Sequence, residues 1–254
     1  MILAVDIGNT NIVLGCFEQN EILFRERVST NRSATDLEYA VTIQTALNMH
    51  QLDRTQITGA ILSSVVPGVT NTVRHAIMKY CGVTPLVVGP GIKTGLSIRI
   101  DNPAQLGSDL VVDAVAGIKE YPAPMIIIDM GTATTFSVID KEKNYLGGVI
   151  TTGMAVSTDA LVSRTSQLPR FSFETPKKVV GTNTVECLKS GIMHGNAAMI
   201  DGMVQRIREE LDEPCTVVAT GGLAALVVPL CKENIILDQD LLLKGLMEIY
   251  RKNQ

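Results

Sequence analysis

The sequence contains no tryptophan, and aromatic residues of all kinds make up only 4% of its 254 residues. Hydrophobic residues nevertheless account for 46% of the chain, so any core must be built mainly from aliphatic side chains. A chain of this length and composition can form one large domain or two smaller ones, each with its own core.

Long runs of positive charge are also missing. The net charge is −4, and the basic residues are dispersed, with no cluster longer than Lys177-Lys178. This distribution argues against nucleic-acid binding, which depends on neutralising phosphates. The five cysteines are odd in number and form no CxxC pair, which is typical of reduced, buried thiols in a cytosolic protein: Cys16, Cys81, Cys187, Cys215 and Cys231.

The sequence has no hydrophobic run that suits a membrane. Asp6 interrupts the first apolar run and no basic residues precede it, so we expect no signal peptide. The longest apolar stretch, Thr216 to Leu230, is too short to cross a bilayer and contains Gly221-Gly222. We therefore expect a soluble, cytoplasmic protein with no membrane partner.

What the sequence does contain is one pattern in two copies. MILAVDIGNTN opens the chain and MIIIDMGTATT begins at residue 125. In each copy an apolar strand runs into an aspartate, Asp6 or Asp129, and a glycine follows two residues later, Gly8 or Gly131. A single D-x-G after a strand is common, but two copies that open similar series of elements indicate an internal duplication.

Each copy is followed by a meander of strands and then by alternating helices and strands. In the first half we expect strands near 2–6, 12–18, 21–28, 59–65 and 85–88, with helices near 36–50, after Pro67 and near 104–120. In the second half we expect strands near 125–129, 134–140, 145–150, 215–219 and 235–237, with helices near 153–166, 183–211 and from about 240. The pattern predicts an α/β protein with domains at 1–120 and 121–254, each a mixed sheet flanked by helices, and an interdomain cleft between the two polar turns.

The two turns suit phosphate. Gly8 and Gly131 allow close approach of the backbone, whose successive N–H groups can form a concave anion site. Short polar side chains that follow each glycine add further donors: Asn9, Thr10 and Asn11 in the first turn, and Thr132, Thr134 and Thr135 in the second. A carboxylate beside phosphate is sensible if a cation lies between them, so we interpret Asp6 and Asp129 as cation-linked. The alternative is that each aspartate only accepts hydrogen bonds from its own turn.

A third candidate is the segment VVGPGIKTGLSIRIDNPAQLGSDL, residues 87–110. It matches neither a P-loop nor a dinucleotide fingerprint, but its glycines could form a backbone-rich wall around a small polar molecule. Asp109 falls in the first turns of the helix predicted to follow. It is either a carboxylate stabilised by the helix dipole or a general base that accepts a proton from an alcohol attacking phosphorus.

A fourth candidate is ATGG at residues 219–222, where a strand ends before a helix. Gly221 and Gly222 would allow the flat ring of a nucleoside to approach the backbone. A tight strand–helix connection without a ligand explains the same residues.

A series of motifs, in this order, resembles the type III pantothenate kinases over essentially the whole chain: DIGNTN at 6–11, GPGIKTGL at 89–96, GSDL at 107–110, DMGTATT at 129–135, GGVI at 147–150, NTVECLKSGI at 183–192 and TGG at 220–222. The resemblance implies two ribonuclease-H-like domains of the actin-like ATPase kind. It also implies transfer of the γ-phosphate of ATP to pantothenate, the first step of coenzyme A synthesis, by a homodimer that needs Mg²⁺ and K⁺ or NH₄⁺.

The resemblance also implies roles for individual residues. Asp109 would be the proton acceptor and Asp129 a ligand of the monovalent cation. Independently of the resemblance, our interpretation of Asp6 as cation-linked would place Mg²⁺ at Asp6. The ATP contacts would be Asp6, Ile7, Gly8, Asn9, Thr10, Asn11, Ile12, Val13 and Thr132, together with Gly221 and Gly222 of the fourth candidate. The pocket for pantothenate would be lined by Gly107, Ser108, Asp109, Leu110, Thr184 and Ile100.

Three positions depart from the family pattern, one of them Thr152, where the family often has proline; the other two concern the substrate. The family commonly has tyrosine where this chain has Ile100, and arginine where it has Leu110. A site that has lost polar partners loses discrimination for a polar substrate. Two alternatives therefore stay open, namely a kinase for a related pantoyl-type alcohol and a non-catalytic nucleotide-binding regulator of the same fold.

Overall fold

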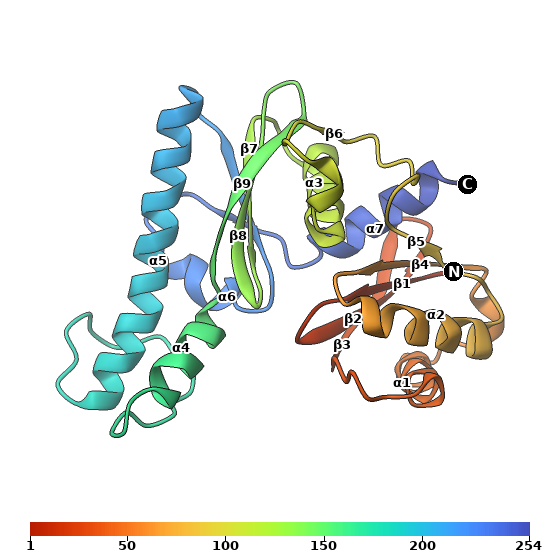
Figure 1. Ribbon diagram of the computed structural model, residues 1–254, viewed down its shortest axis with the longest axis horizontal. Helices are drawn as coiled ribbons and strands as arrows, with labels where there is room; N and C mark the ends of the chain where they lie inside the picture. The colour runs from red at the N-terminus through yellow and green to blue at the C-terminus, as the bar shows by residue number, and fades with distance from the viewer. The chain divides into compact units, whose positions relative to one another are not determined.

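The computed structural model describes residues 1–254, which form two compact units (Figure 1). Unit 1 contains Met1–Gly95, Asn102–Ala116 and Leu242–Gln254, and unit 2 contains Leu96–Asp101 and Gly117–Leu241. Both chain termini therefore belong to unit 1. The last helix, α7 (Leu241–Lys252), packs in unit 1, whereas a division at residue 120 would assign it to the second half.

The sheet of unit 1 has the strand order β3-β2-β1-β4-β5. Its central strand β1 pairs antiparallel with β2 and parallel with β4, and β2 continues antiparallel into β3. The strands are β1 (Ile2–Ile7), β2 (Asn11–Glu18), β3 (Glu21–Ser29), β4 (Gly59–Ser64) and β5 (Leu86–Val87).

The sheet of unit 2 repeats this order, because β9-β8-β7-β10-β11 follows the same sequence of antiparallel and parallel pairs. The strands are β7 (Met125–Met130), β8 (Ala133–Ile139), β9 (Asn144–Thr152), β10 (Thr216–Thr220) and β11 (Ile236–Leu237). One further strand, β6 (Ser97–Ile98), pairs with the outer edge of β9. Sequence analysis missed β6 because two residues are too few to show an alternating pattern.

The core of unit 1 lies between its sheet and two helices, α1 (Asp36–Met49) and α2 (Pro67–Cys81), as Figure 1 shows. Thr35 caps α1 and forms a capping box with Glu38, which confirms the predicted start of this helix. α7 packs closely on glycines in β2 and β4, because a Cβ on Gly15 would lie 2.8 Å from Leu243 and Gly59 faces the Tyr250 ring. Arg54–Gln56 adds a short 3₁₀ turn before β4.

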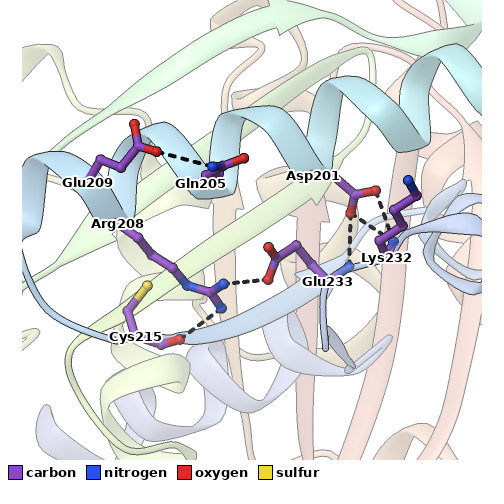
Figure 2. Close-up of polar contacts among 7 residues, drawn as sticks. All are labelled: Asp201, Gln205, Arg208, Glu209, Cys215, Lys232 and Glu233. Carbon is purple, nitrogen blue, oxygen red and sulfur yellow. Dashed lines mark hydrogen bonds and ion pairs between the residues drawn. The ribbon is translucent and has the colours of Figure 1, made fainter.

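The core of unit 2 lies between its sheet and α5 (Thr184–Leu211), a long helix joined by α4 (Met154–Ser163), α6 (Ala224–Val227) and the 3₁₀ turn Val228–Leu230. Figure 2 shows how α5 is tied to the segment before β11. The Asp201 carboxylate accepts both the backbone N–H of Lys232, at 2.9 and 3.0 Å, and that of Glu233, at 3.1 Å. Arg208 pairs with Glu233 and donates to the Cys215 carbonyl at 3.4 Å, so the end of the helix is fixed by a charged network.

Three details refine the expectations. The helix predicted near 104–120 is α3 (Ser108–Glu120), preceded by a separate 3₁₀ turn at Pro103–Gln105. All five cysteines are free thiols, but only Cys16 is buried: three others are partly exposed, and Cys187 is exposed because it lies off the buried face of α5. Among the helices, none combines the length and the apolar character that a membrane crossing requires.

Candidate functional site

The Gly8 turn lies between β1 and β2 and is held by backbone and side-chain hydrogen bonds. The Gly8 N–H donates to the Asn11 carbonyl at 3.0 Å, which closes the turn. Thr30, just after β3, fastens it from outside: its N–H donates to the Thr10 carbonyl at 2.9 Å, and its hydroxyl donates to the Gly8 carbonyl at 2.7 Å. The turn is therefore fixed in the absence of a ligand, with Asp6 buried at the end of β1.

The predicted ATP segment 6–13 is not uniformly accessible. Asn9 and Thr10 are exposed, whereas the side chains of Ile7 and Ile12 are fully buried. Only the backbone of these two isoleucines could meet a ligand. The side chain of Asn9 accepts a hydrogen bond from the Arg32 guanidinium, between Oδ1 and Nη2 at 3.2 Å.

A cluster of three serines holds the helix that carries Asp109 at the same end of the unit 1 sheet. Asp6 of β1 lies beside Ser63 of β4 in the parallel register. The Ser63 hydroxyl donates to the Ser108 hydroxyl at 3.0 Å; Ser108 in turn donates to the Ser64 carbonyl at 3.0 Å and accepts the Ser64 N–H at 3.2 Å. The first turn of α3 is thereby fastened to the end of β4, next to the strand that carries Asp6.

The carboxylate of Asp109 is folded back over Gly107. A Cβ at Gly107 would lie 2.5 Å from the Asp109 Oδ1, so this close position requires glycine. Burial raises the pKa of Asp109, against the opposing effect of the backbone N–H groups of Leu110 and Asp109 itself. A carboxylate with a raised pKa is a stronger base, which suits a proton acceptor.

In unit 2, the Gly131 turn is enclosed by two other glycines. The Gly131 N–H donates to the Ala133 carbonyl at 2.9 Å. Gly221, at φ 95°, packs so closely that a Cβ would overlap the Asp129 carboxylate and lie 2.6 Å from the Met130 nitrogen. From the other side, the N–H of Gly153 donates to the Thr132 carbonyl at 3.1 Å, and a Cβ on Gly153 would overlap the carbonyl oxygens of Gly131 and Thr132.

Threonines flank Asp129 in the sheet. Thr135 of β8 and Thr220 of β10 are its direct neighbours in the sheet. The hydroxyls of Thr134 and Thr135 are buried and have no hydrogen-bond partner in the protein. Carboxylate and hydroxyl oxygens are ligands that hard cations prefer, so this end of β7 has the chemistry of a cation site.

The remaining predicted residues are distributed between the units. Ile100, Thr184 and Gly222 belong to unit 2, whereas Gly107–Leu110 belong to unit 1. Thr184 is the exposed first residue of α5. Ile100 follows β6, and its Cγ2 would be in van der Waals contact, at 4.0 Å, with a Cβ placed on Gly147. The structure thus brings Asp6 close to the start of α3 and Asp129 close to Gly221.

Several residues at these sites were not found by sequence analysis: Arg32, Ser63, Ser64 and Gly153. Each is distant along the chain from the residue it contacts and belongs to no motif of its own. Only the position of Gly153, at the cap of a helix, was visible as a local signal.

A family model described as type III pantothenate kinase matches residues 2–206. A type III pantothenate kinase of Halalkalibacterium halodurans is 44% identical over 253 residues, covering 100% of each chain, and one of Bacillus cytotoxicus is 45% identical, covering 100% of this chain and 97% of its own. Among solved structures, the activator of the 2-hydroxyisocaproyl-CoA dehydratase from Clostridium difficile with bound ADPNP matches with a TM-score of 0.58 at 14% identity, covering 99% of this chain and 94% of that one. At that identity the likeness shows a shared fold alone, and it agrees with two mixed sheets flanked by helices.

Proposed function

Because the chain belongs to the family of type III pantothenate kinases, we propose that it transfers the γ-phosphate of ATP to the hydroxyl group of pantothenate, the first step of coenzyme A synthesis. The position of Asp109 is the observation that carries this proposal. Its carboxylate has a raised pKa, and the serine cluster fastens its helix beside the strand that leads into the Gly8 turn.

In the reaction, the substrate hydroxyl loses its proton to Asp109 while its oxygen attacks the terminal phosphorus. The new P–O bond forms as the bond to the leaving ADP oxygen breaks. Proton transfer to a positioned base typically contributes roughly 10²–10⁴-fold in rate. Most of the remaining acceleration would come from positioning and charge neutralisation.

We assign the ATP phosphates to the backbone N–H groups and short side chains of residues 6–13 and to Thr132. The closed Gly8 turn supports the first assignment, since its backbone is held in position by the Asn11 carbonyl and by Thr30. Gly221 and Gly222 are assigned to the nucleoside. The direct packing of Gly221 on Asp129 gives Gly221 a second task, which is to hold that carboxylate in place.

The residues present fit the cations implied by the family. Mg²⁺ is commonly held by one or two carboxylates together with substrate phosphates, which Asp6 beside the Gly8 turn could provide. K⁺ or NH₄⁺ would be held by Asp129 with the buried hydroxyl of Thr135, its direct partner on the neighbouring strand. When bound, these ions offset the charge of the phosphate oxygens.

We assign the substrate pocket to Gly107–Leu110, Ile100 and Thr184. Leu110 and Ile100 offer aliphatic side chains, which favours a second candidate substrate, a pantoyl-type alcohol that lacks the full polar character of pantothenate. A cytoplasmic homodimer completes the proposal. The exposed apolar side chains of Ile150, Val179 and Val180 on unit 2, at 74%, 67% and 78% exposure, support a covered surface there.

The test is ATP-dependent turnover of the purified protein with pantothenate, with pantetheine and with pantothenol, each with and without K⁺. Phosphopantothenate formed only with K⁺ or NH₄⁺ would agree with the proposal. Preference for the uncharged alcohols would select the second candidate. Nucleotide binding without any phosphoryl transfer would instead indicate a non-catalytic regulator.

A further inference from the structure

Arg32 is an exposed arginine directly beside the Gly8 turn, and no motif of the sequence includes it. Its guanidinium donates from Nη2 to the Oδ1 of Asn9 at 3.2 Å. This acceptor is a neutral amide, so the contact orients the arginine without neutralising it. Arg32 takes part in none of the ion pairs of the structure.

The backbone that carries Arg32 is fixed on both sides. Thr30 donates two hydrogen bonds to the Gly8 turn, as described above. Asn31 is held by the buried Tyr39, whose hydroxyl accepts the Asn31 N–H at 3.0 Å and donates to the Asn31 carbonyl at 2.8 Å. Arg32 therefore extends from a segment whose position relative to the turn is set before any ligand binds.

What distinguishes Arg32 from the other exposed cations is its position. Other exposed cations also lack an acidic partner, but the contact with Asn9 places the charge of Arg32 directly at the Gly8 turn, in a chain whose net charge is −4. A guanidinium has five N–H donors, of which the Asn9 contact uses one. The donors that remain form a planar fork that matches two oxygens of a phosphate.

We propose that Arg32 is a further catalytic residue, which binds the terminal phosphate of ATP at the Gly8 turn and stabilises the charge on the phosphoryl group during transfer. This inference rests on the proposed function. Arg32 makes and breaks no covalent bond: the phosphoryl group passes from ADP to the substrate oxygen, and the proton goes to Asp109. An arginine in this role is worth 10³–10⁵-fold in kcat when fully enclosed, and we expect roughly 10²-fold for the exposed Arg32.

The test compares Arg32→Lys, Arg32→Ala and the control Arg54→Gln. Arg54 is a matched control because it is also exposed and carries the same charge. Its guanidinium donates to the Tyr80 carbonyl at 3.3 Å rather than to a residue of the Gly8 turn. We expect Arg32→Ala to lower kcat roughly 10²-fold with a smaller change in KM for ATP, and added guanidinium ions to restore part of the rate. Arg32→Lys should recover little, because an ammonium cannot bind two oxygens at once, and Arg54→Gln should behave as the unchanged protein.

Binding measurements keep this inference separate from the proposed function. The preference for ATP over ADP, measured by calorimetry without any acceptor, should fall at least tenfold in Arg32→Ala and stay constant in Arg54→Gln. If the unchanged protein phosphorylates no pantoyl compound but Arg32→Ala loses the ATP preference, the proposed function fails while the phosphate contact stands. A rise in KM alone, or an unaltered kcat and ATP preference in a folded Arg32→Ala protein, would overturn the inference about Arg32.

Discussion

The two glycine turns are built on the same scheme, but different neighbours surround them. Each follows the central strand of a sheet with the same strand order, and each carries an aspartate two residues before the glycine. In unit 1, the neighbouring parallel strand β4 ends in Ser63-Ser64, and the Ser63 hydroxyl and the Ser64 backbone hold α3, which carries Asp109. In unit 2, the neighbouring strand β10 ends at Thr220. Gly221 follows it, and because this residue has no side chain its backbone packs directly on Asp129.

The comparison indicates how a duplicated unit acquires two roles. In our proposal the strand–turn–strand module supplies an anion-binding backbone in both copies, and the end of the adjacent strand decides what lies next to it. In unit 1, Ser63 and Ser64 hold the helix that carries Asp109, the proposed base. In unit 2, the absence of a side chain on Gly221 lets the backbone pack directly on the Asp129 carboxylate. Substitutions at these neighbouring positions should therefore affect one role and spare the other.

The largest effect is expected from Asp109→Asn, which removes the base from unit 1. We expect turnover to fall by roughly 10²–10⁴-fold. Because burial raises the pKa of Asp109, its charge is less favourable in the folded protein than in the unfolded chain at neutral pH. The Asn variant should therefore have a higher Tm at pH 7, and this gain should vanish as the pH falls below the ordinary pKa of a carboxyl group.

Asp36→Asn is the matched control, since Asp36 also lies in the first turn of a helix, α1. The hydrogen bond from Lys79 lowers the pKa of Asp36, so its charge favours the folded state. We expect a slightly lower Tm at pH 7 and normal turnover. An Asp109→Asn protein with full turnover would remove Asp109 from the reaction.

An intermediate effect is expected from Gly153→Ala in unit 2. The added methyl group would overlap the Gly131 and Thr132 carbonyl oxygens, so the turn must shift, and overpacking of this kind costs about 1–3 kcal/mol of folding free energy. We expect kcat/KM for ATP to fall roughly 10- to 100-fold, with a higher K⁺ concentration needed for half-maximal activity.

Gly195→Ala provides the comparison, because a Cβ at Gly195 in α5 meets no atom within 4 Å. Alanine is the better helix former, so this variant should be at least as stable as the parent and equally active. Gly153→Ala with unaltered K⁺ and ATP dependence would show that the Gly131 turn needs no support from α4.

The duplication and its two acidic turns are visible in the sequence, because both depend on local signals: apolar strands, D-x-G, and the turn residues between strands. The start of α1, predicted near residue 36, is also marked by a local signal, because Thr35 caps the helix. Arg32, Ser63 and Gly153 could not be found in this way. Their contacts with Asn9, Ser108 and Thr132 join segments distant in sequence, and no rule of periodicity or composition selects one serine or glycine among many for such a contact.

The smallest effect is expected from Ser63→Ala, which removes one of the hydrogen bonds that fasten α3 to β4. Ser108 keeps its two contacts with the Ser64 backbone, so the free energy of unfolding should fall by the contribution of one neutral hydrogen bond, about 1 kcal/mol, and kcat should change less than in Asp109→Asn or Gly153→Ala. A looser α3 would admit water to Asp109 and move its raised pKa back toward the ordinary value. The acid limb of the kcat/KM profile should then shift to lower pH.

Ser137→Ala distinguishes this positioning role from a general loss of stability. Ser137 is another buried serine whose hydroxyl is hydrogen-bonded to a second hydroxyl, that of Tyr145 at 3.2 Å, but it lies in β8 of unit 2. Its replacement should lower Tm to a similar degree and leave the acid limb in place. If both variants shift the acid limb of the kcat/KM profile equally, or neither does, Ser63 has no specific influence on Asp109. The serines at the end of β4 would then differ from Gly221, which follows β10, in packing alone.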